Sequence, residues 1–152
     1  MKPGQMMIAL VCGSALLPSM AQEERKFDRC FEQAANRYGL NKRMLVAIAR
    51  TESALTPHVI GPRNQNGSYD IGMMQINSSW LPTLAKYGIG QRELLNACTN
   101  IDVGAWILAH NVARHGPTWK AVGAYNAASP DKQQKYVAKV QQNYILVGGP
   151  GR

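Results

Sequence analysis

Two carboxylates in this sequence are placed where acid–base chemistry is possible. Glu52 comes four residues after Ile48 and seven after Leu45 in an amphipathic helical pattern, so it shares their inward face. Desolvation among such apolar side chains raises the pKa of a carboxyl group. The second carboxylate, Asp70, follows the pair Asn66–Gly67, which favours a tight hairpin turn. One carboxylate on a helix and another on a hairpin suit the cleavage of a sugar polymer.

The segment 64–80 could line a groove for such a polymer. Gly72 has no side chain, so another molecule could approach its backbone closely. Gln75 and Asn77 each carry an amide that can donate and accept hydrogen bonds. Trp80 offers a flat apolar face, suited either to the core or to stacking on a sugar.

Several residues of this segment and of the helices also have an ordinary structural explanation. An acid at a helix end, such as Glu52, is more often solvated than catalytic, and Asp70 could simply bond its own backbone in a hairpin. Met73 and Met74 fit packing or groove lining. Trp119 fits a position in the core of a helix.

Other kinds of chemistry have no matching pattern in the sequence. His58, His110 and His115 do not have metal-ligand spacing, and we assign all three to structure or surface. We find neither a nucleophilic Ser-His-Asp set nor a glycine loop that could cradle phosphates. We therefore expect neither a metal ion nor a cofactor.

The first 21 residues have the features of a cleaved secretory signal. Lys2 precedes the apolar run 6–17, and small residues place the cleavage before Gln22. The run is shorter than the ~20 residues that a membrane anchor needs. We assign Cys12 to this leader. Residues 22–147 then form one domain, and residues 148–152 a mobile tail.

Export also bears on the cysteines and on the charge. Cys30 and Cys98 remain in the exported chain, and an oxidising compartment favours their pairing. Removal of Lys2 with the leader lowers the net charge from +8 to +7. A basic balance suits a polyanion such as a carboxylate-bearing cell wall, although it could serve solubility alone. Export and the lack of a matching motif exclude nucleic acid.

Helical periodicity dominates the rest of the chain. A helix is expected over 27–38, and a second is expected to be capped by Asn41 and stopped by Pro57. After the second helix, residues 58–76 predict a small irregular hairpin that turns at Asn66–Gly67. Further helices are expected from Ser78 or Ser79 to Tyr87, and over 91–95, 97–115, 118–126 and 129–144. The expected fold is mainly α, with one small β-hairpin after the second helix.

Three short motifs, in order, carry a resemblance to a known family. They are Glu52-Ser53, then Gly72-Met-Met-Gln-Ile-Asn77, then Ala124-Tyr-Asn-Ala127. Together they resemble the family-1 lytic transglycosylases, over nearly all of the exported chain. The small size is most similar to the wall-opening enzymes of type III and type IV secretion and conjugation systems. The resemblance implies a lysozyme-like α+β domain, a periplasmic location, peptidoglycan as substrate and a secretion-system component as a further partner.

The resemblance also implies roles for individual residues. Glu52 corresponds to the catalytic acid and base, which protonates the leaving oxygen and then takes the proton of the muramic 6-hydroxyl to form an anhydro ring. The remaining matched residues would bind the substrate or support the carboxylate: Ser53, Gly72, Met74, Gln75, Asn77, Tyr125 and Asn126.

Asp70 departs from this family. Most lytic transglycosylases lack a second acid there, whereas the run around Asp70 is similar to the hairpin of animal C-type lysozymes. A lysozyme-type muramidase that uses Glu52 and Asp70 is therefore the first alternative. A catalytically silent wall-binding or assembly protein is an alternative from another class.

Overall fold

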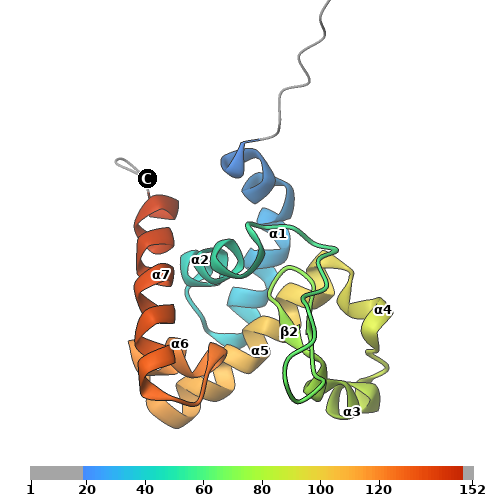
Figure 1. Ribbon diagram of the computed structural model, residues 1–152. Helices are drawn as coiled ribbons and strands as arrows, with labels where there is room; N and C mark the ends of the chain where they lie inside the picture. Colours follow the sequence, from blue (N-terminus) through green and yellow to red (C-terminus); the bar gives the residue numbers. More distant parts are fainter. Residues whose placement is uncertain (1–18, 149–152) are drawn as a thin grey trace, which may run out of the picture.

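The computed structural model describes residues 19–148, which form a mainly helical domain with one small sheet (Figure 1). Most of the predicted leader, and residues 149–152 of the predicted tail, lie outside the described residues. The elements in order are α1 (Met20–Tyr38), α2 (Lys42–Ser53), β1 (Asp70–Ile71), β2 (Ile76–Asn77), η1 (Ser78–Trp80), α3 (Leu81–Leu84), η2 (Ala85–Tyr87), α4 (Gln91–Leu94), α5 (Ala97–His115), α6 (Trp119–Asn126) and α7 (Pro130–Gly148).

The first helix, α1, is longer than the predicted 27–38. The Ser19 side chain accepts a hydrogen bond from the Gln22 amide at 3.3 Å, so α1 includes the last two residues of the predicted leader. The helix ends as predicted at Gly39, in the left-handed conformation with φ 64°. Its buried face, which includes Phe27 and Phe31, packs against α5.

The second helix, α2, carries Glu52 and ends before the predicted stop. Asn41 caps its start by accepting a hydrogen bond from the Met44 amide at 3.4 Å, as expected. At the other end Ala54 turns into the left-handed region with φ 51°, so Ser53 is the last helical residue and Pro57 is not the terminator. Residues 45–49 are all buried, which fixes this helix in the centre of the core.

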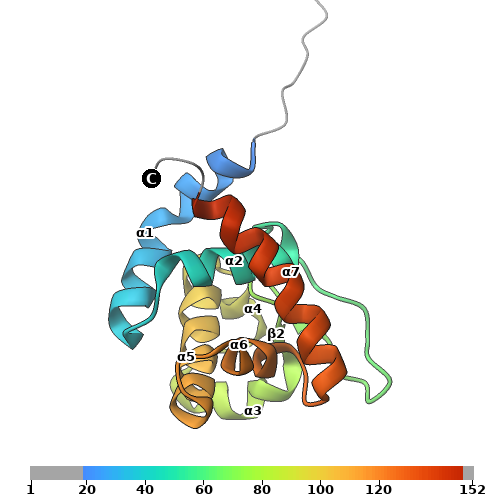
Figure 2. The same ribbon diagram turned by 90° about the vertical axis from the view of Figure 1, so that its left-hand side faces the viewer.

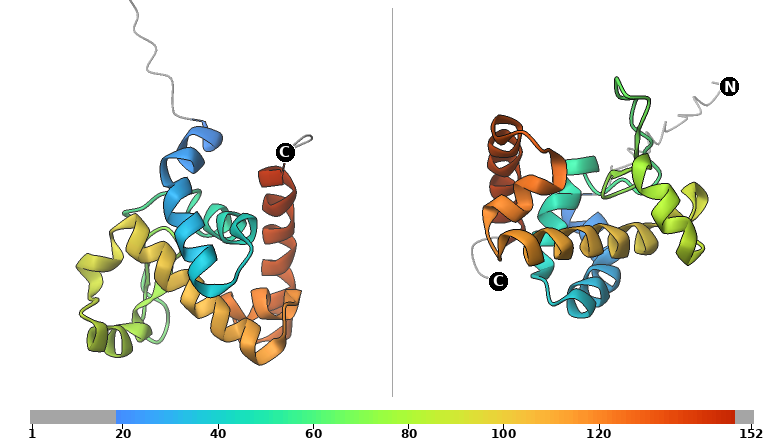
Figure 3. Two further views of the ribbon diagram at one scale, coloured as in Figure 1. Left: turned by 180° about the vertical axis from the view of Figure 1, so that it is seen from behind. Right: turned by 90° about the horizontal axis from the view of Figure 1, so that it is seen from below.

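The long helix α5 spans the molecule and contacts both N-terminal and C-terminal helices (Figure 3). It contacts α1, α2 and α6, and near its start it contacts α4. The predicted disulfide is confirmed: Cys30 of α1 is joined to Cys98 in the first turn of α5, with their Cα atoms 5.1 Å apart.

The predicted hairpin is present, but its paired strands lie beyond Asn66–Gly67. Strand β1 pairs with β2 in antiparallel register, Asp70 opposite Asn77 and Ile71 opposite Ile76. These strands are joined by the turn 72–75, so the prediction that they turn at Asn66–Gly67 is wrong. The chain does turn at Gly67, where φ is 80°, and this outer loop returns to a bridge between Ile60 and Ile71.

The last two helices close the domain on the side away from α3 and α4. Helix α7 runs across α2 and α6 (Figure 2). Arg43 of α2 lies under the Tyr144 ring, 4.0 Å from its centroid, and donates to the Tyr144 carbonyl at 2.6 Å. The expected core position of Trp119 is wrong: the residue is 38% exposed, and its ring lies edge-on to that of Tyr144.

Among residues 19–148, no helix combines the length and the apolar character that crossing a bilayer would require.

Candidate active site

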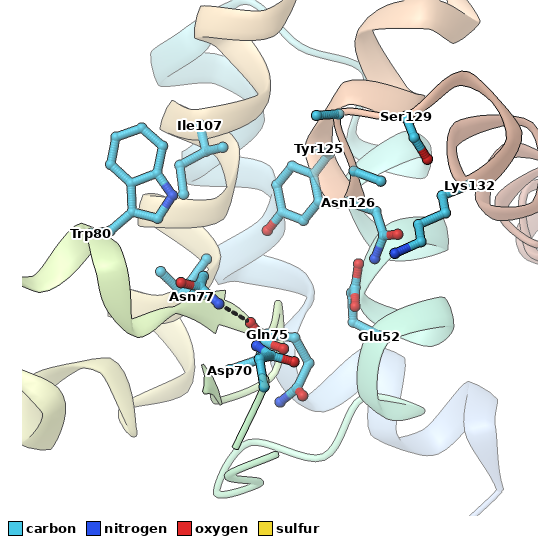
Figure 4. Close-up of a pocket in the computed structure, with 14 residues that line it drawn as sticks. Glu52, Asp70, Gln75, Asn77, Trp80, Ile107, Tyr125, Asn126, Ser129 and Lys132 are labelled. Carbon is cyan, nitrogen blue, oxygen red and sulfur yellow. Dashed lines mark hydrogen bonds between the residues drawn. The ribbon is translucent and has the colours of Figure 1, made fainter. Parts of the chain in front are cut away.

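One cavity of about 580 Å³ contains both candidate carboxylates (Figure 4). Glu52 faces it from the end of α2, and Asp70 faces it from β1, so a helix and the hairpin form its facing walls. We call it the main cavity. Its lining residues are Glu52, Asn64, Asp70, Gln75, Ile76, Asn77, Trp80, Ile107, Tyr125, Asn126, Ala127, Ala128, Ser129 and Lys132.

The Glu52 carboxyl group is held in the form that an acid catalyst needs. Its pKa is raised from 4.5 to about 7, mainly by burial, and the charge of Asp70 acts in the same direction. The Tyr136 hydroxyl donates a hydrogen bond to Oε1 at 2.5 Å, and this bond and the charge of Lys139 act in the opposite direction. Because burial is the largest effect, a substantial fraction of Glu52 is protonated near neutral pH.

Asp70 is fixed by the strand register rather than by its own backbone. Asn77, its partner across the hairpin, donates a hydrogen bond from Nδ2 to Asp70 Oδ1 at 2.9 Å (Figure 4). The same Nδ2 donates to Ser68 Oγ at 3.1 Å, and Asn77 Oδ1 accepts from the Ser79 amide at 3.0 Å. Asn77, and not Ser78 or Ser79, is therefore the cap of the following helical segment.

The turn between the strands presents Gln75 to the cavity. Gln75 has a positive φ of 49°, which an L-residue seldom adopts, and its Nε2 donates to the Gly72 carbonyl at 2.9 Å. This hydrogen bond holds the side chain in place and leaves its Oε1 as an acceptor for a ligand.

Three other predicted site residues lie behind the wall of the main cavity. Met74 has no exposed surface, and Ser53 donates from Oγ to the Met73 carbonyl at 2.7 Å, which ties the end of α2 to the hairpin turn. Gly72 has φ 75°, and a side chain there would collide with Asn100. The sequence suggested that another molecule approaches the Gly72 backbone closely, but it is the protein's own Asn100 side chain that does so.

Asn100, a fully buried polar residue behind the hairpin, was not predicted from the sequence. Its Oδ1 accepts from the Met74 amide at 2.6 Å, and its Nδ2 donates to the carbonyls of Ile71 at 2.9 Å and Leu94 at 2.8 Å. Asn100 lies in the first turns of α5 and so fixes the hairpin to the central helix. In the sequence Asn100 stands beside Thr99 at the start of the predicted helix, and this position does not indicate that it fixes the hairpin.

Helix α6 supplies a third wall. The Tyr125 hydroxyl donates to the Met74 carbonyl at 2.9 Å, which joins α6 to the hairpin turn beneath the cavity. Burial is the main cause that raises the Tyr125 pKa well above its ordinary value, so the hydroxyl stays protonated and serves as a donor. The next residue, Asn126, lines the main cavity beside Glu52 (Figure 4).

Two further residues of the site, Tyr136 and Lys132, were not identified from sequence, and Asn64 was included only as the start of the segment 64–80. Tyr136 is buried on α7 and contacts Glu52 across 84 positions of sequence. A tyrosine on the apolar face of a predicted helix is typical of a core, so only the docking of α7 on α2 reveals its contact.

Trp80 fits both roles that its type allowed. It is half-buried, with its ring edge-on to Trp106 at 5.4 Å between centroids, and it also lines the main cavity. One part of the indole therefore packs on the core, while the remainder can contact a sugar.

The donor set of the site favours acid–base chemistry. No group of three or more His, Cys, Asp or Glu side chains among residues 19–148 could hold a metal ion. His110, one of the three histidines considered above, places Nδ1 3.0 Å from the Trp106 carbonyl. The arrangement can deliver a proton from Glu52 while Asp70 presents a negative charge on the facing wall.

Comparison with known proteins assigns this arrangement to a family. The invasion protein IagB of Salmonella typhimurium is 41% identical over 125 residues, which cover 79% of this chain and 78% of that protein. A peptidoglycan-binding-like protein of Escherichia coli O157:H7 is 38% identical over 125 residues, 77% of this chain and 75% of that protein.

The fold is also that of a solved enzyme. An inactive mutant of the lytic transglycosylase Slt from Pseudomonas aeruginosa aligns with a TM-score of 0.64 and 23% identity. The alignment covers 80% of this chain and 24% of that structure, and at this low identity it shows the fold alone. Residues 29–145 match the family described as the transglycosylase SLT domain, and the chain therefore belongs to that family.

Proposed function

We propose that the protein is a peptidoglycan lytic transglycosylase that cleaves the β-1,4 bond between N-acetylmuramic acid and N-acetylglucosamine. The observation that carries this proposal is Glu52, a carboxyl group with its pKa raised to about 7, in a cavity it shares with Asp70. A group with such a pKa can donate a proton at neutral pH and accept one afterwards.

The first step is the departure of the N-acetylglucosamine oxygen. Glu52 transfers its proton to that oxygen as the bond to muramic C1 breaks, and positive charge develops on the muramic ring. Tyr136 donates to Oε1, so the other carboxyl oxygen, Oε2, is the one to face the substrate. The anion of Asp70 on the opposite wall stabilises the developing charge.

The second step closes the product ring. Glu52, now ionised, takes the proton from the muramic 6-hydroxyl, and O6 forms a bond with C1. The proton lost in the first step is thereby restored, no water is consumed, and the product carries a 1,6-anhydro ring. Gln75, Asn77 and Asn126 supply amides along the main cavity that can hold the sugar hydroxyl and acetamido groups.

A lysozyme-type hydrolase is the second candidate, and Asp70 is the observation that favours it. The carboxylate faces the main cavity and is held by Asn77, as a nucleophile or a charge-stabilising group would need to be. In that reaction Glu52 activates water after the bond breaks. The third candidate, a silent wall-binding protein, is disfavoured by the raised pKa of Glu52 and by the hydrogen bond that Tyr136 donates to it.

The mass of the released muropeptide separates the candidates. Purified peptidoglycan digested by the protein should release fragments that are lighter by one water than the reducing-end fragments a muramidase releases. Reducing ends alone would establish the hydrolase, and no release by a folded protein would establish the silent binder. Digestion by the Glu52→Gln variant is the control for contaminating activity.

The place of action is also a proposal. The predicted leader supports export to the periplasm, and the relative named an invasion protein supports local opening of the wall for a secretion apparatus. Fusion of residues 1–21 to a reporter that is active only after export tests the first point. Secretion by cells that carry Glu52→Gln in place of the natural residue tests the second.

A further inference from the structure

A second cavity, of about 300 Å³, opens beside Glu52 on the side of α7. Three lysines of α7, Lys132, Lys135 and Lys139, line it together with Glu52 and Asn126. We call it the lysine pocket. It shares Glu52, Asn126 and Lys132 with the main cavity, and Figure 4 shows Lys132 extending from α7 toward Asn126 and Glu52. The two cavities are therefore adjacent at the catalytic carboxyl group.

The positive charge of the lysine pocket is only partly offset within the described chain, by Glu52. The spacing of the lysines, three and then four residues, places all of them on one face of α7. None of the three forms an ion pair with another residue of 19–148, whereas Lys42 pairs with both Asp28 and Glu32. Glu52 is the sole acid among the lining residues, so the pocket is cationic even when Glu52 is ionised.

This charge also does not match the glycan. The hydroxyl and acetamido groups of the two sugars are neutral, and the lactyl carboxyl of muramic acid is converted to an amide where a peptide is attached. The anions of peptidoglycan are the free carboxylates of that peptide. The peptide is attached through the lactyl group at O3 of the muramic ring. Glu52 would protonate the glycosidic oxygen at C1 of that same ring, so the peptide leaves the glycan close to Glu52.

We propose that the lysine pocket binds the stem peptide of peptidoglycan through its carboxylates and so directs cleavage to muramic acid residues that carry a peptide. This inference rests on the proposed function for its substrate. It adds a specificity site to the reaction: the main cavity holds the glycan, and the α7 lysines select the branch. Exposed ion pairs are individually weak and screened by salt, so the selection arises from several lysines together and is strongest at low ionic strength.

The test compares two substrates and two variants. Glycan strands whose stem peptides carry free carboxylates, and the same strands with those carboxylates converted to amides, are each cleaved by the wild type, by Lys135→Gln and by the control Lys120→Gln. The control residue is exposed, lines neither cavity, and its substitution removes the same charge. Lys132 is left unchanged because it also lines the main cavity, and Lys139 because its charge lowers the pKa of Glu52.

Lys135→Gln should lose about two- to fivefold in kcat/KM on strands with free peptide carboxylates and should equal the wild type on the amidated strands. The control variant should match the wild type on both, and the loss should shrink at 0.5 M salt. Equal losses on both substrates would show that the lysines attract the glycan or the wall in general. No loss on either would make them solvated surface charges; both results overturn the proposal.

A binding measurement keeps this inference separate from the activity. The free stem peptide is titrated into Glu52→Gln protein while NMR follows the α7 amides and the lysine side chains, with a carboxyl-amidated peptide as control. The proposal requires shifts at Lys135 and Lys139 with the acidic peptide and their absence with the amidated one. If the wild type cleaves neither strand, the proposed function fails, and this titration still decides whether the pocket binds the peptide.

Discussion

Glu52 must be protonated for the first step of the proposed reaction and ionised for the second. A pKa raised to about 7 leaves both forms populated near neutral pH, which is the condition for a group that donates and then accepts a proton. The cause is mainly burial, so the same environment that tunes the acid also opposes its ionisation in the folded protein.

The variant Glu52→Gln should therefore be inactive and also more stable at high pH. Losing the general acid should reduce the cleavage rate by about 10²–10⁴-fold. The carboxyl group has a higher pKa folded than unfolded, so its ionisation removes stability as pH rises from about 4.5 to about 7. The variant should gain on the order of 2–3 kcal/mol in the free energy of unfolding at pH 8.

Urea unfolding of both proteins at pH 4 and pH 8 measures this gain. At pH 4 Glu52 is largely protonated in both states, so the two proteins should have nearly equal stability there. Equal stability at pH 8 as well would contradict the raised pKa, and rapid wall cleavage by the folded variant would exclude Glu52 as the acid.

Asp70→Asn separates the charge of this residue from its place in the hairpin. The amide can still bond Asn77, so the fold should persist, but the anion on the cavity wall is lost. The turnover rate should fall, although by less than in Glu52→Gln. Since the charge of Asp70 raises the pKa of Glu52, the alkaline limb of the rate profile should move to lower pH. A rate and profile equal to those of the wild type would reduce Asp70 to a structural residue.

At the scale of elements, the site depends on how α7 lies against α2. The hydrogen bond from Tyr136 to Glu52 crosses that contact, and Asn143 of α7 donates to Thr51 Oγ1 at 2.9 Å one residue away from Glu52. Helix α7 thus positions the acid in addition to covering the core.

Tyr136→Phe should leave α7 in place while removing the hydrogen bond to Glu52. That bond lowers the Glu52 pKa, so its loss should move the alkaline limb of the rate profile to higher pH, opposite to the effect of Asp70→Asn. The rate at the optimum should fall modestly, because Glu52 is less firmly oriented. Tyr87→Phe, at a side chain that is 71% exposed, is the matched control and should change neither quantity. A shift to lower pH would contradict the structure.

The sequence predicted most helices well because their signals are local. Gly39, Asn41 and the apolar stripe of 45–49 act through neighbours within a few residues, and the structure confirms each. The hairpin strands and the end of α2 were misplaced, because Asn66–Gly67 and Pro57 are strong turn and stop signals in isolation. The structure instead uses the positive φ angles of Ala54, Gly72 and Gln75, which the contacts of the hairpin with Ser53 and Asn100 hold in place.

Asn100→Ala tests the link between α5 and the hairpin. It removes one acceptor and two donor contacts to buried backbone groups, and it should cost about 3–5 kcal/mol in the free energy of unfolding. Cleavage should also slow, because the hairpin positions Asp70. Asn111→Ala on the same helix is the control: its buried Nδ2 has no partner among the described residues, so the loss there should be under about 1 kcal/mol. Similar losses in both variants would contradict the role of Asn100.

At the scale of the whole molecule, the residues of the site come from parts of the chain that meet only in the folded domain. Glu52 and Tyr136 lie 84 positions apart, and Tyr125 and Met74 lie 51 apart. Such pairs leave no periodic trace in a single sequence, and for this reason Tyr136 and Asn100 were not predicted. Tyr125 was identified only through the resemblance of its motif to a family, whereas Glu52 was also suggested by its place on the apolar face of a helix.

The disulfide acts on the whole molecule through its unfolded state. Cys30 and Cys98 are 68 positions apart, and closing a loop of that length stabilises the folded protein by about 4 kcal/mol in the chain-entropy model. The bond joins α1 to α5 and touches neither cavity. Its loss in Cys30→Ala/Cys98→Ala should thus lower the unfolding midpoint without changing kcat/KM under conditions where the protein stays folded.

Mass spectrometry of unreduced, alkylated protein is the check on the starting state, since a bridged chain takes up no alkylating group at these two cysteines. Urea unfolding of the oxidised protein, the reduced protein and the double variant then gives the stability of each. The reduced protein and the variant should agree, because both release the same loop. A loss of activity in proportion to the loss of stability at low urea would show that the bridge shapes the folded site as well, whereas unchanged unfolding midpoints would show that it contributes nothing.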